Sequence, residues 1–290
     1  MFTGSHVAIV TPFRKGKVDE RALGDLIEWQ IAKGTNGIVP CGTTGESATL
    51  SHEEHNRVIE LTVEVVRRRV PVMAGTGSNS TDEAISLTKH AKQAGADAAL
   101  LITPYYNKPT QEGLYRHYKA IAEAVDLPLV LYNIPGRTGV NMFPATIARL
   151  AVIETIVGVK EGSGVIQQAS DIVQTCGDRL AVLAGDDAMT LPMMAVGGKG
   201  VITVTANIAP TEMANMVKAF AAGNIEEARR IHFQLSPLFA ALFYETNPIP
   251  VKEALGMMGK IDPELRLPLC SMGKENRDKL MQVMKEGRFI

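Results

Sequence analysis

The segment Ile156-Val157-Gly158-Val159-Lys160-Glu161-Gly162 contains one of the short β-branched runs whose number decides the fold of this chain. Its apolar residues predict a buried strand, and Lys160 lies at the end of that strand. An ammonium is costly to bury, so this position favours a neutral amine, which attacks carbonyl carbons. The segment alone would also fit a lysine that extends into solvent beyond the strand end.

Similar runs occur eight times and alternate with amphipathic helical patterns. The expected strands span residues 7–10, 37–39, 70–74, 98–102, 129–132, 156–160, 181–184 and 200–204. Apolar residues at three- and four-residue spacing predict intervening helices that include 20–32, 53–68, 81–94 and 112–124. Eight strand-helix alternations predict an α/β protein with a (β/α)8 (TIM) barrel.

Helical patterns continue after the last expected strand. They begin at residue 210 and include 225–243, 250–258 and 274–285. Closing a barrel requires less helix than this. We therefore expect a catalytic barrel domain over residues 1–224 and a helical C-terminal region over residues 225–290.

Composition excludes several classes of function. The 290 residues carry a formal net charge of −1 with dispersed basic residues, which argues against nucleic-acid binding. No apolar run approaches the roughly 20 residues that span a bilayer, and the N-terminus lacks a signal-peptide pattern, so we expect no membrane association. Cys41, Cys176 and Cys270 have no metal-ligand spacing, and they favour a reducing, cytoplasmic setting without a metal.

Small and polar residues follow the expected strands at their carboxyl ends. Examples are Gly42-Thr43-Thr44-Gly45-Glu46, Asn133-Ile134-Pro135 and Gly185-Asp186-Asp187. In a barrel these segments open onto the face that holds the active site. The first of them could bind a carboxylate or a phosphate through backbone N–H groups and hydroxyls, although it is not a P-loop. Ordinary turn chemistry accounts for most of the glycines.

Four motifs in order carry a family resemblance. They are Gly42-Thr43-Thr44-Gly45-Glu46, Pro104-Tyr105-Tyr106, Tyr132-Asn133-Ile134-Pro135-Gly136-Arg137-Thr138-Gly139 and Gly158-Val159-Lys160-Glu161. Together they resemble the pyruvate-dependent class I lyases, which include N-acetylneuraminate lyase, and within that group the dihydrodipicolinate synthase branch. The resemblance extends from Gly4 to Asn247-Pro248-Ile249-Pro250-Val251-Lys252.

The resemblance implies a mechanism without metal or organic cofactor. Lys160 would form an imine with pyruvate, and loss of a methyl proton would yield an enamine nucleophile. Tyr132 would transfer protons, connected through Thr43 to Tyr106, which in the family reaches in from a neighbouring subunit.

The resemblance also implies the substrates. Thr44 would contact the pyruvate carboxylate, and Arg137 would bind a second carboxylate through two parallel hydrogen bonds, as aspartate β-semialdehyde requires. Gly185, Asp186 and Ile202 would line the pocket. The product would be 4-hydroxy-tetrahydrodipicolinate, formed in the first committed step of lysine biosynthesis by the diaminopimelate route.

Seven further positions match the family's regulatory site for L-lysine: Ser47, Ala48, His52, His55, Asn79, Glu83 and Tyr105. The two histidines alone would fit an ordinary surface helix. The full set implies feedback inhibition by L-lysine. The resemblance further implies a homotetramer made of two tight dimers.

One departure and three alternatives accompany this interpretation. The family commonly continues after Lys160-Glu161 with alanine and then threonine or serine, whereas this chain has Gly162-Ser163-Gly164, which should loosen the turn.

The same imine would also serve a sialic-acid or keto-deoxy-sugar-acid lyase. A non-catalytic barrel that senses pyruvate or an amino acid is a further alternative, and a pyridoxal-phosphate enzyme is a weaker one.

Overall fold

The computed structural model describes residues 2–290. The strands are β1 (Gly4–Ala8), β2 (Phe13–Arg14), β3 (Lys17–Val18), β4 (Gly37–Val39), β5 (Met73–Gly75), β6 (Ala98–Ile102), β7 (Leu129–Asn133), β8 (Ile156–Glu161), β9 (Ala181–Ala184) and β10 (Gly200–Thr203). The α-helices are α1 (Glu20–Ala32), α2 (His52–Val66), α3 (Thr81–Ala94), α4 (Gln111–Ala124), α5 (Pro135–Thr138), α6 (Pro144–Leu150), α7 (Ile166–Cys176), α8 (Thr190–Ala195), α9 (Pro210–Ala221), α10 (Ile225–Ala241), α11 (Ile249–Met257) and α12 (Lys274–Glu286). Short 3₁₀ helices are η1 (Ser47–Thr49), η2 (Gly177–Arg179), η3 (Asp187–Met189) and η4 (Thr205–Asn207).

Eight strands form one sheet in the order β4-β1-β10-β9-β8-β7-β6-β5. The pairings from β5 through β10 and between β1 and β4 are parallel. This order, with helices between successive strands, is that of a (β/α)8 barrel, so the predicted fold class is confirmed.

The predicted strands agree closely with the observed ones. The first strand begins at Gly4, three residues before its predicted start, and ends at Ala8, two residues before its predicted end. Strand β5 begins at Met73, three residues after its predicted start, and ends at Gly75, one residue after its predicted end. The antiparallel pair of β2 with β3 was not predicted, because two-residue strands are too short to show a periodicity.

The chain packs as two compact units, which are described separately. The first unit comprises Pro71–Ile202 together with the N-terminal residues through Gly4, and the second comprises Ser5–Val70 and Thr203–Ile290.

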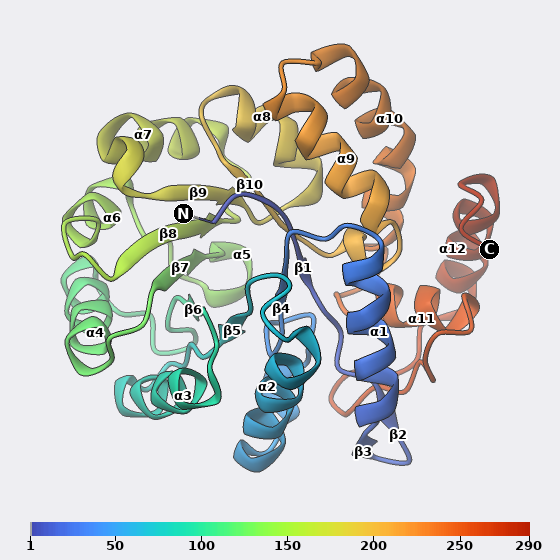
Figure 1. The fold of residues 1–290 in the computed structure, drawn as a ribbon, viewed down its shortest axis with the longest axis horizontal. Helices are drawn as coiled ribbons and strands as arrows, with labels where there is room; N and C mark the ends of the chain where they lie inside the picture. Colours follow the sequence, from blue (N-terminus) through green and yellow to red (C-terminus); the bar gives the residue numbers. More distant parts are fainter. Residues whose placement is uncertain (1) are drawn as a thin grey trace. The chain divides into compact units, whose positions relative to one another are not determined.

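In the first unit, consecutive strands lie side by side and helices cover them (Figure 1). Helix α3 packs on β6, helices α7 and α8 pack on β9, and each of α3, α4, α6 and α7 contacts the next. The middle strands β7 and β8 are almost entirely buried, as expected for parallel strands with apolar surroundings on both faces. The carboxyl end of β8 therefore places Lys160 in a sheltered position.

In the second unit, α1 packs against α2, and the helices after β10 pack on one another. Side-chain caps define several helix starts. Asp19 accepts a hydrogen bond from the backbone N–H of Ala22 at α1, and Ser51 and Glu54 form a capping box at α2. Helix α10 begins at Ile225, and from this residue onward the chain consists of helices and loops. A domain boundary at residue 224 stays a prediction.

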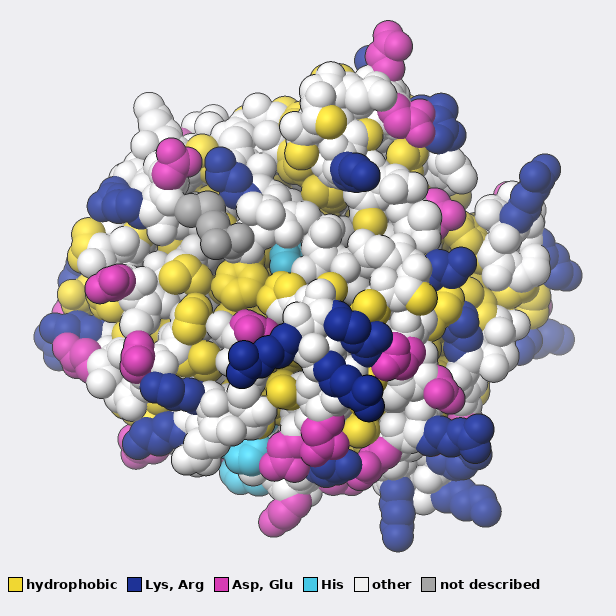
Figure 2. Space-filling model, viewed as in Figure 1, with side chains coloured by type: hydrophobic (Ala, Val, Ile, Leu, Met, Phe, Trp, Pro, Cys, Tyr) yellow, Lys and Arg dark blue, Asp and Glu magenta, His cyan; other side chains and the backbone are white. Residues whose placement is uncertain are grey.

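Charged side chains of both signs are intermingled on the face seen in Figure 2. This distribution agrees with a formal net charge of −1. Within residues 2–290, every helix is too short or too polar to span a bilayer.

Candidate active site

Lys160 is the next-to-last residue of β8, and its side chain is buried with 6% of its surface exposed. The register of the sheet places it beside Tyr132 of β7 on one side and Leu183 of β9 on the other. The strand pattern thus holds the amine inside the first unit. The alternative of a solvent-exposed lysine is wrong.

Burial lowers the pKa of Lys160 from its ordinary value of 10.5 to about 8. Desolvation is the main cause, because it penalises the ammonium more than the neutral amine. The carboxylate of Asp187 opposes this shift, and the guanidinium of Arg137 adds to it. The neutral, nucleophilic form of the amine is therefore far more populated near neutral pH than in a lysine of ordinary pKa.

Tyr132 is an aromatic neighbour of this amine. The Lys160 Nζ atom lies 4.3 Å from the centre of the Tyr132 ring, and the tyrosine side chain is itself buried. Thr103 at the end of β6 donates a hydrogen bond of 2.7 Å to the Tyr132 carbonyl oxygen, which fixes the strand end. The phenol is thereby held on a rigid element beside the amine.

Glu161 forms the centre of a buried polar network that the sequence did not reveal. Its carboxylate accepts hydrogen bonds from Asn133 Nδ2 (3.0 Å), Gln168 Nε2 (3.0 Å) and the backbone N–H of Ser163 (2.7 Å). Asn141 joins the network through Asn133 and Gln168. The donors satisfy a charge that is 2% exposed, and they hold the ends of β7 and β8 together next to Lys160.

The Gly162-Ser163-Gly164 turn is held by hydrogen bonds. The Gly162 N–H donates to the Asn133 carbonyl at 2.8 Å, and a Cβ atom at Gly162 would meet that oxygen at 3.1 Å. Gly164 has a φ of +75°, a conformation that glycine adopts without strain. A looser turn than in the family stays a prediction.

The segment after β9 supplies the remaining predicted pocket residues of the first unit. Gly185 donates its N–H to the Glu161 carbonyl at 2.8 Å, and a Cβ atom there would lie 3.0 Å from Gly162 Cα, so a side chain would require the neighbouring backbone to shift. The Asp186 carboxylate accepts a hydrogen bond from the backbone N–H of Ala188 and caps η3. Ile202 is buried on β10.

Arg137 and Tyr106 are exposed rather than in the core. Arg137 belongs to the short helix α5, directly after β7, and is exposed. Its influence on the pKa of Lys160 places its charge within electrostatic reach of the amine. Tyr106 has a left-handed φ of +70° and is 90% exposed, which is unusual for an aromatic side chain.

Thr43 and Thr44 belong to the second unit. The loop from Gly42 to Glu46 is closed by backbone hydrogen bonds from Gly45 to Gly42 and from Glu46 to Thr43, each 3.1 Å. Thr44 is buried, and its hydroxyl oxygen accepts a hydrogen bond of 3.0 Å from Asn247 Nδ2.

The residues predicted to bind L-lysine form two groups. In the first unit, Asn79 Nδ2 donates to the Tyr105 carbonyl at 3.3 Å, and the charge of Glu83 contributes to a raised pKa of Tyr105, after desolvation. In the second unit, Ser47 and Ala48 lie in η1, His52 begins α2, and His55 lies one turn further. His52 is exposed and His55 is buried, so the two rings have different surroundings.

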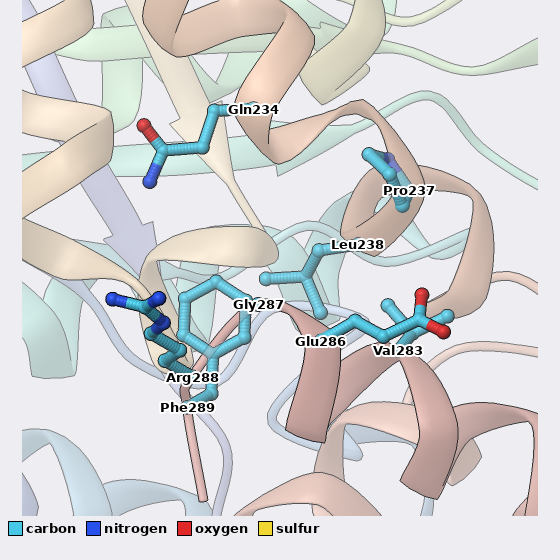
Figure 3. A pocket seen from close by; sticks show the side chains of 8 residues that line it. All are labelled: Gln234, Pro237, Leu238, Val283, Glu286, Gly287, Arg288 and Phe289. Carbon is cyan, nitrogen blue, oxygen red and sulfur yellow. The ribbon is translucent and has the colours of Figure 1, made fainter.

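Two further observations bear on binding. Within residues 2–290, no three His, Cys, Asp or Glu side chains form a group that could hold a metal ion. A cavity of about 300 Å³ in the second unit lies between α10 and the C-terminal end of α12 (Figure 3). Its lining contains none of the predicted site residues and consists of Gln234, Pro237, Leu238, Val283, Glu286, Gly287, Arg288 and Phe289.

A buried amine of depressed pKa at the carboxyl end of a barrel strand, with a phenol on the adjacent strand, is suited to covalent catalysis on a keto acid. The fold and this arrangement define the class of imine-forming lyases and aldolases.

Within that class, the chain belongs to the dihydrodipicolinate synthetase family, whose sequence profile matches residues 1–287. The chain is 64% identical over 291 aligned residues to the 4-hydroxy-tetrahydrodipicolinate synthase of Syntrophobacter fumaroxidans, and the alignment covers both chains completely. The crystal structure of dihydrodipicolinate synthase from Aquifex aeolicus is similar with a TM-score of 0.98, at 50% identity over 99% of each chain. The lysine-bound enzyme from Cyanidioschyzon merolae has a TM-score of 0.97, at 41% identity over 100% of this chain and 99% of that one.

Proposed function

We propose that this chain is a lyase that condenses pyruvate with L-aspartate β-semialdehyde to form 4-hydroxy-tetrahydrodipicolinate, the first committed step of the diaminopimelate route to lysine. The observation that carries this proposal is the buried amine of Lys160, with a pKa of about 8, beside Tyr132. Full-length relatives that bear this enzyme's name support the choice of reaction.

The reaction begins when the neutral amine of Lys160 attacks the keto carbon of pyruvate. Loss of water from the resulting carbinolamine gives an imine, and removal of a methyl proton gives an enamine. The enamine carbon then attacks the aldehyde carbon of the semialdehyde, whose oxygen takes up a proton, and the imine to Lys160 forms again. The amino group of the semialdehyde attacks this imine carbon, and the Lys160 amine leaves, which closes the ring and frees the enzyme. The methyl proton leaves readily because the imine nitrogen accepts the electron pair.

We assign the proton transfers to Tyr132. Its ring lies against the amine, so its hydroxyl belongs to the same sheltered space. A neutral phenol moves protons without placing a second charge beside Lys160. By resemblance to the family, Thr43 and Tyr106 extend this relay.

The substrate assignments follow the chemistry of carboxylates. We propose that Thr44 binds the carboxylate of pyruvate and that Arg137 binds the carboxylate of the semialdehyde. Arg137 is exposed on α5, directly after the strand that carries Tyr132, which suits a group that receives the second substrate. We propose Gly185, Asp186 and Ile202 as pocket-lining residues.

Borohydride reduction in the presence of pyruvate tests the central step. We expect a stable adduct on the peptide that contains Lys160, and no adduct in Lys160→Ala. An adduct elsewhere, or undiminished synthesis by Lys160→Ala, would refute the proposal. Assays with the semialdehyde and with sialic or keto-deoxy sugar acids distinguish the synthase from the sugar-acid lyases.

We further propose that L-lysine inhibits the enzyme. Glu83 supplies a carboxylate for an amino group and lies within electrostatic reach of Tyr105, whose carbonyl accepts a hydrogen bond from Asn79. The lysine-bound relative has the same fold. Initial rates should fall with added L-lysine, and Glu83→Gln should weaken this inhibition while it leaves the uninhibited rate unchanged. A rate independent of L-lysine in the wild type would contradict the proposal.

The remaining predictions concern assembly and location. A tyrosine that is 90% exposed, as Tyr106 is, fits a side chain that enters a neighbouring subunit of a homotetramer. Sedimentation of the active enzyme checks this, since an active monomer would remove the role of Tyr106 in a neighbour's relay. A cytoplasmic location also stays a prediction.

A further inference from the structure

The C-terminal segment makes direct contact with the loop that carries Thr44. Asn247 follows α10 and precedes α11, is 4% exposed, and donates from Nδ2 to Thr44 Oγ1 at 3.0 Å. A hydroxyl that accepts a hydrogen bond from an amide keeps its own proton for another acceptor. Asn247 thus leaves the Thr44 hydroxyl available as a donor, which is what a carboxylate ligand needs.

A buried ion pair fixes the same loop two residues further on. Lys252 Nζ of α11 lies 2.6 Å from Glu46 Oε1, and the two side chains are 0% and 1% exposed. The second carboxylate oxygen of Glu46 accepts a hydrogen bond from the backbone N–H of Arg266 at 3.2 Å. Lys252 also lies 4.2 Å from the centre of the Phe13 ring.

Arg266 connects this loop to α2. Its guanidinium forms two hydrogen bonds of 2.6 Å with the Glu54 carboxylate and donates to the Thr49 carbonyl at 2.9 Å. Glu46 itself has a left-handed φ of +52°, which is strained for a residue with a side chain. The contacts from the C-terminal segment therefore hold Glu46 in this strained backbone conformation.

We propose that Asn247 and Lys252 are positioning residues for substrate binding: Asn247 orients the Thr44 hydroxyl, and Lys252 holds the loop through Glu46. Neither touches the reacting atoms in this assignment. The helical C-terminal segment then contributes to pyruvate affinity, in addition to covering apolar surface. The inference rests on the proposed role of Thr44 in binding the pyruvate carboxylate.

The test uses the full-length enzyme and pyruvate, with borohydride trapping at Lys160 as the readout. Asn247→Asp keeps the shape of the side chain but replaces the donor with an acceptor, so the Thr44 hydroxyl would turn its proton toward residue 247. We expect the half-saturating pyruvate concentration to rise about tenfold or more, as expected when a hydrogen bond to a charged group is lost. The trapping rate at saturating pyruvate should change much less.

A test of the Lys252–Glu46 ion pair needs a variant that leaves no unpaired charge in the interior. Lys252→Met combined with Glu46→Gln removes both charges, whereas Lys252→Met alone leaves a buried carboxylate and risks misfolding. The double variant should also raise the half-saturating pyruvate concentration. Arg277→Gln is the control, because it breaks an ion pair of 2.7 Å between α12 and Glu253 of α11 without touching the loop, and it should leave pyruvate saturation unchanged.

The outcomes separate this inference from the proposed function. If Thr44→Val weakens pyruvate binding while Asn247→Asp and the double variant lower only the unfolding temperature, the two residues are merely structural and the inference is wrong. If Thr44→Val itself leaves pyruvate saturation unchanged, both the role of Thr44 and the inference fail. Loss of the adduct in Lys160→Ala would still support the imine mechanism in either case.

Discussion

Replacement of Lys160 by methionine should stabilise the folded protein at neutral pH, although it should abolish imine formation. Methionine has a similar length and no charge, so it fits the buried site without the desolvation cost of an ammonium. The opposite expectation, a loss of stability, would follow if the lysine formed a favourable buried ion pair.

The magnitude follows from the pKa of Lys160. The fall in the pKa of Lys160 from 10.5 to about 8 corresponds to a free-energy cost of burying the ammonium of at most about 3.4 kcal/mol, at 1.36 kcal/mol for each pKa unit. Because the folded state binds the proton more weakly than the unfolded state, the penalty is fully present below pH 8. Stability rises between pH 8 and pH 10.5, where the penalty disappears. The advantage of methionine should therefore be about 3 kcal/mol at pH 7 and nearly absent at pH 10.5.

Urea unfolding of both proteins at pH 7 and pH 10 measures this difference. With a slope of about 3 kcal/mol per molar urea for a chain of this size, the midpoint should rise by about 1 M at pH 7. Lys119→Met changes a lysine whose side chain is 46% exposed and should leave the midpoint nearly unchanged. A lower midpoint for Lys160→Met at pH 7, or an equal gain at both pH values, would refute the reasoning.

Other variants test the surroundings of the amine. The rate of borohydride trapping with pyruvate should rise with pH through an inflection near pH 8 and level off above it, since the neutral amine of Lys160 reacts. Asp187→Asn should move this inflection to lower pH and Arg137→Gln to higher pH, because the anion raises and the cation lowers the pKa of Lys160; shifts in the opposite directions would contradict the assignment. Tyr132→Phe should reduce steady-state turnover about 100-fold or more while the pyruvate adduct still forms, and full turnover would exclude the relay. Glu161→Gln should lower the free energy of unfolding by about 2 kcal/mol, measured by urea titration, because its amide group would face donors; an unchanged midpoint would show that the network is dispensable.

Most of the architecture could be predicted from local patterns. The predicted strands over residues 37–39, 98–102 and 181–184 coincide with β4, β6 and β9. Buried parallel strands are continuous apolar runs, and such runs are visible without knowledge of their partners. The hairpin of β2 with β3 was missed because its pairing involves only two residues on each side.

The candidate site was only partly predictable. Lys160 was found because a lysine within an apolar strand is unusual, and its burial beside Tyr132 agrees with that prediction. Glu161 was passed over as part of a motif, since its value depends on three donors from different segments. Lys252, like Lys160, is a lysine among apolar residues in the sequence. It lies on a helix, however, where a long side chain often reaches solvent, so its burial could not be predicted.

Periodicity and strand-end chemistry along the chain were sufficient to predict a (β/α)8 barrel with a lysine at the end of a strand, because both are properties of neighbouring residues. The contacts of Asn247 with Thr44 and of Lys252 with Glu46 join residues 203 and 206 positions apart, and no local pattern specifies them. They arise only when the folded chain brings its C-terminal segment onto the loop after β4. Folding also removes water from the Lys160 side chain, and this desolvation, which depends on the surrounding structure, lowers its pKa to about 8.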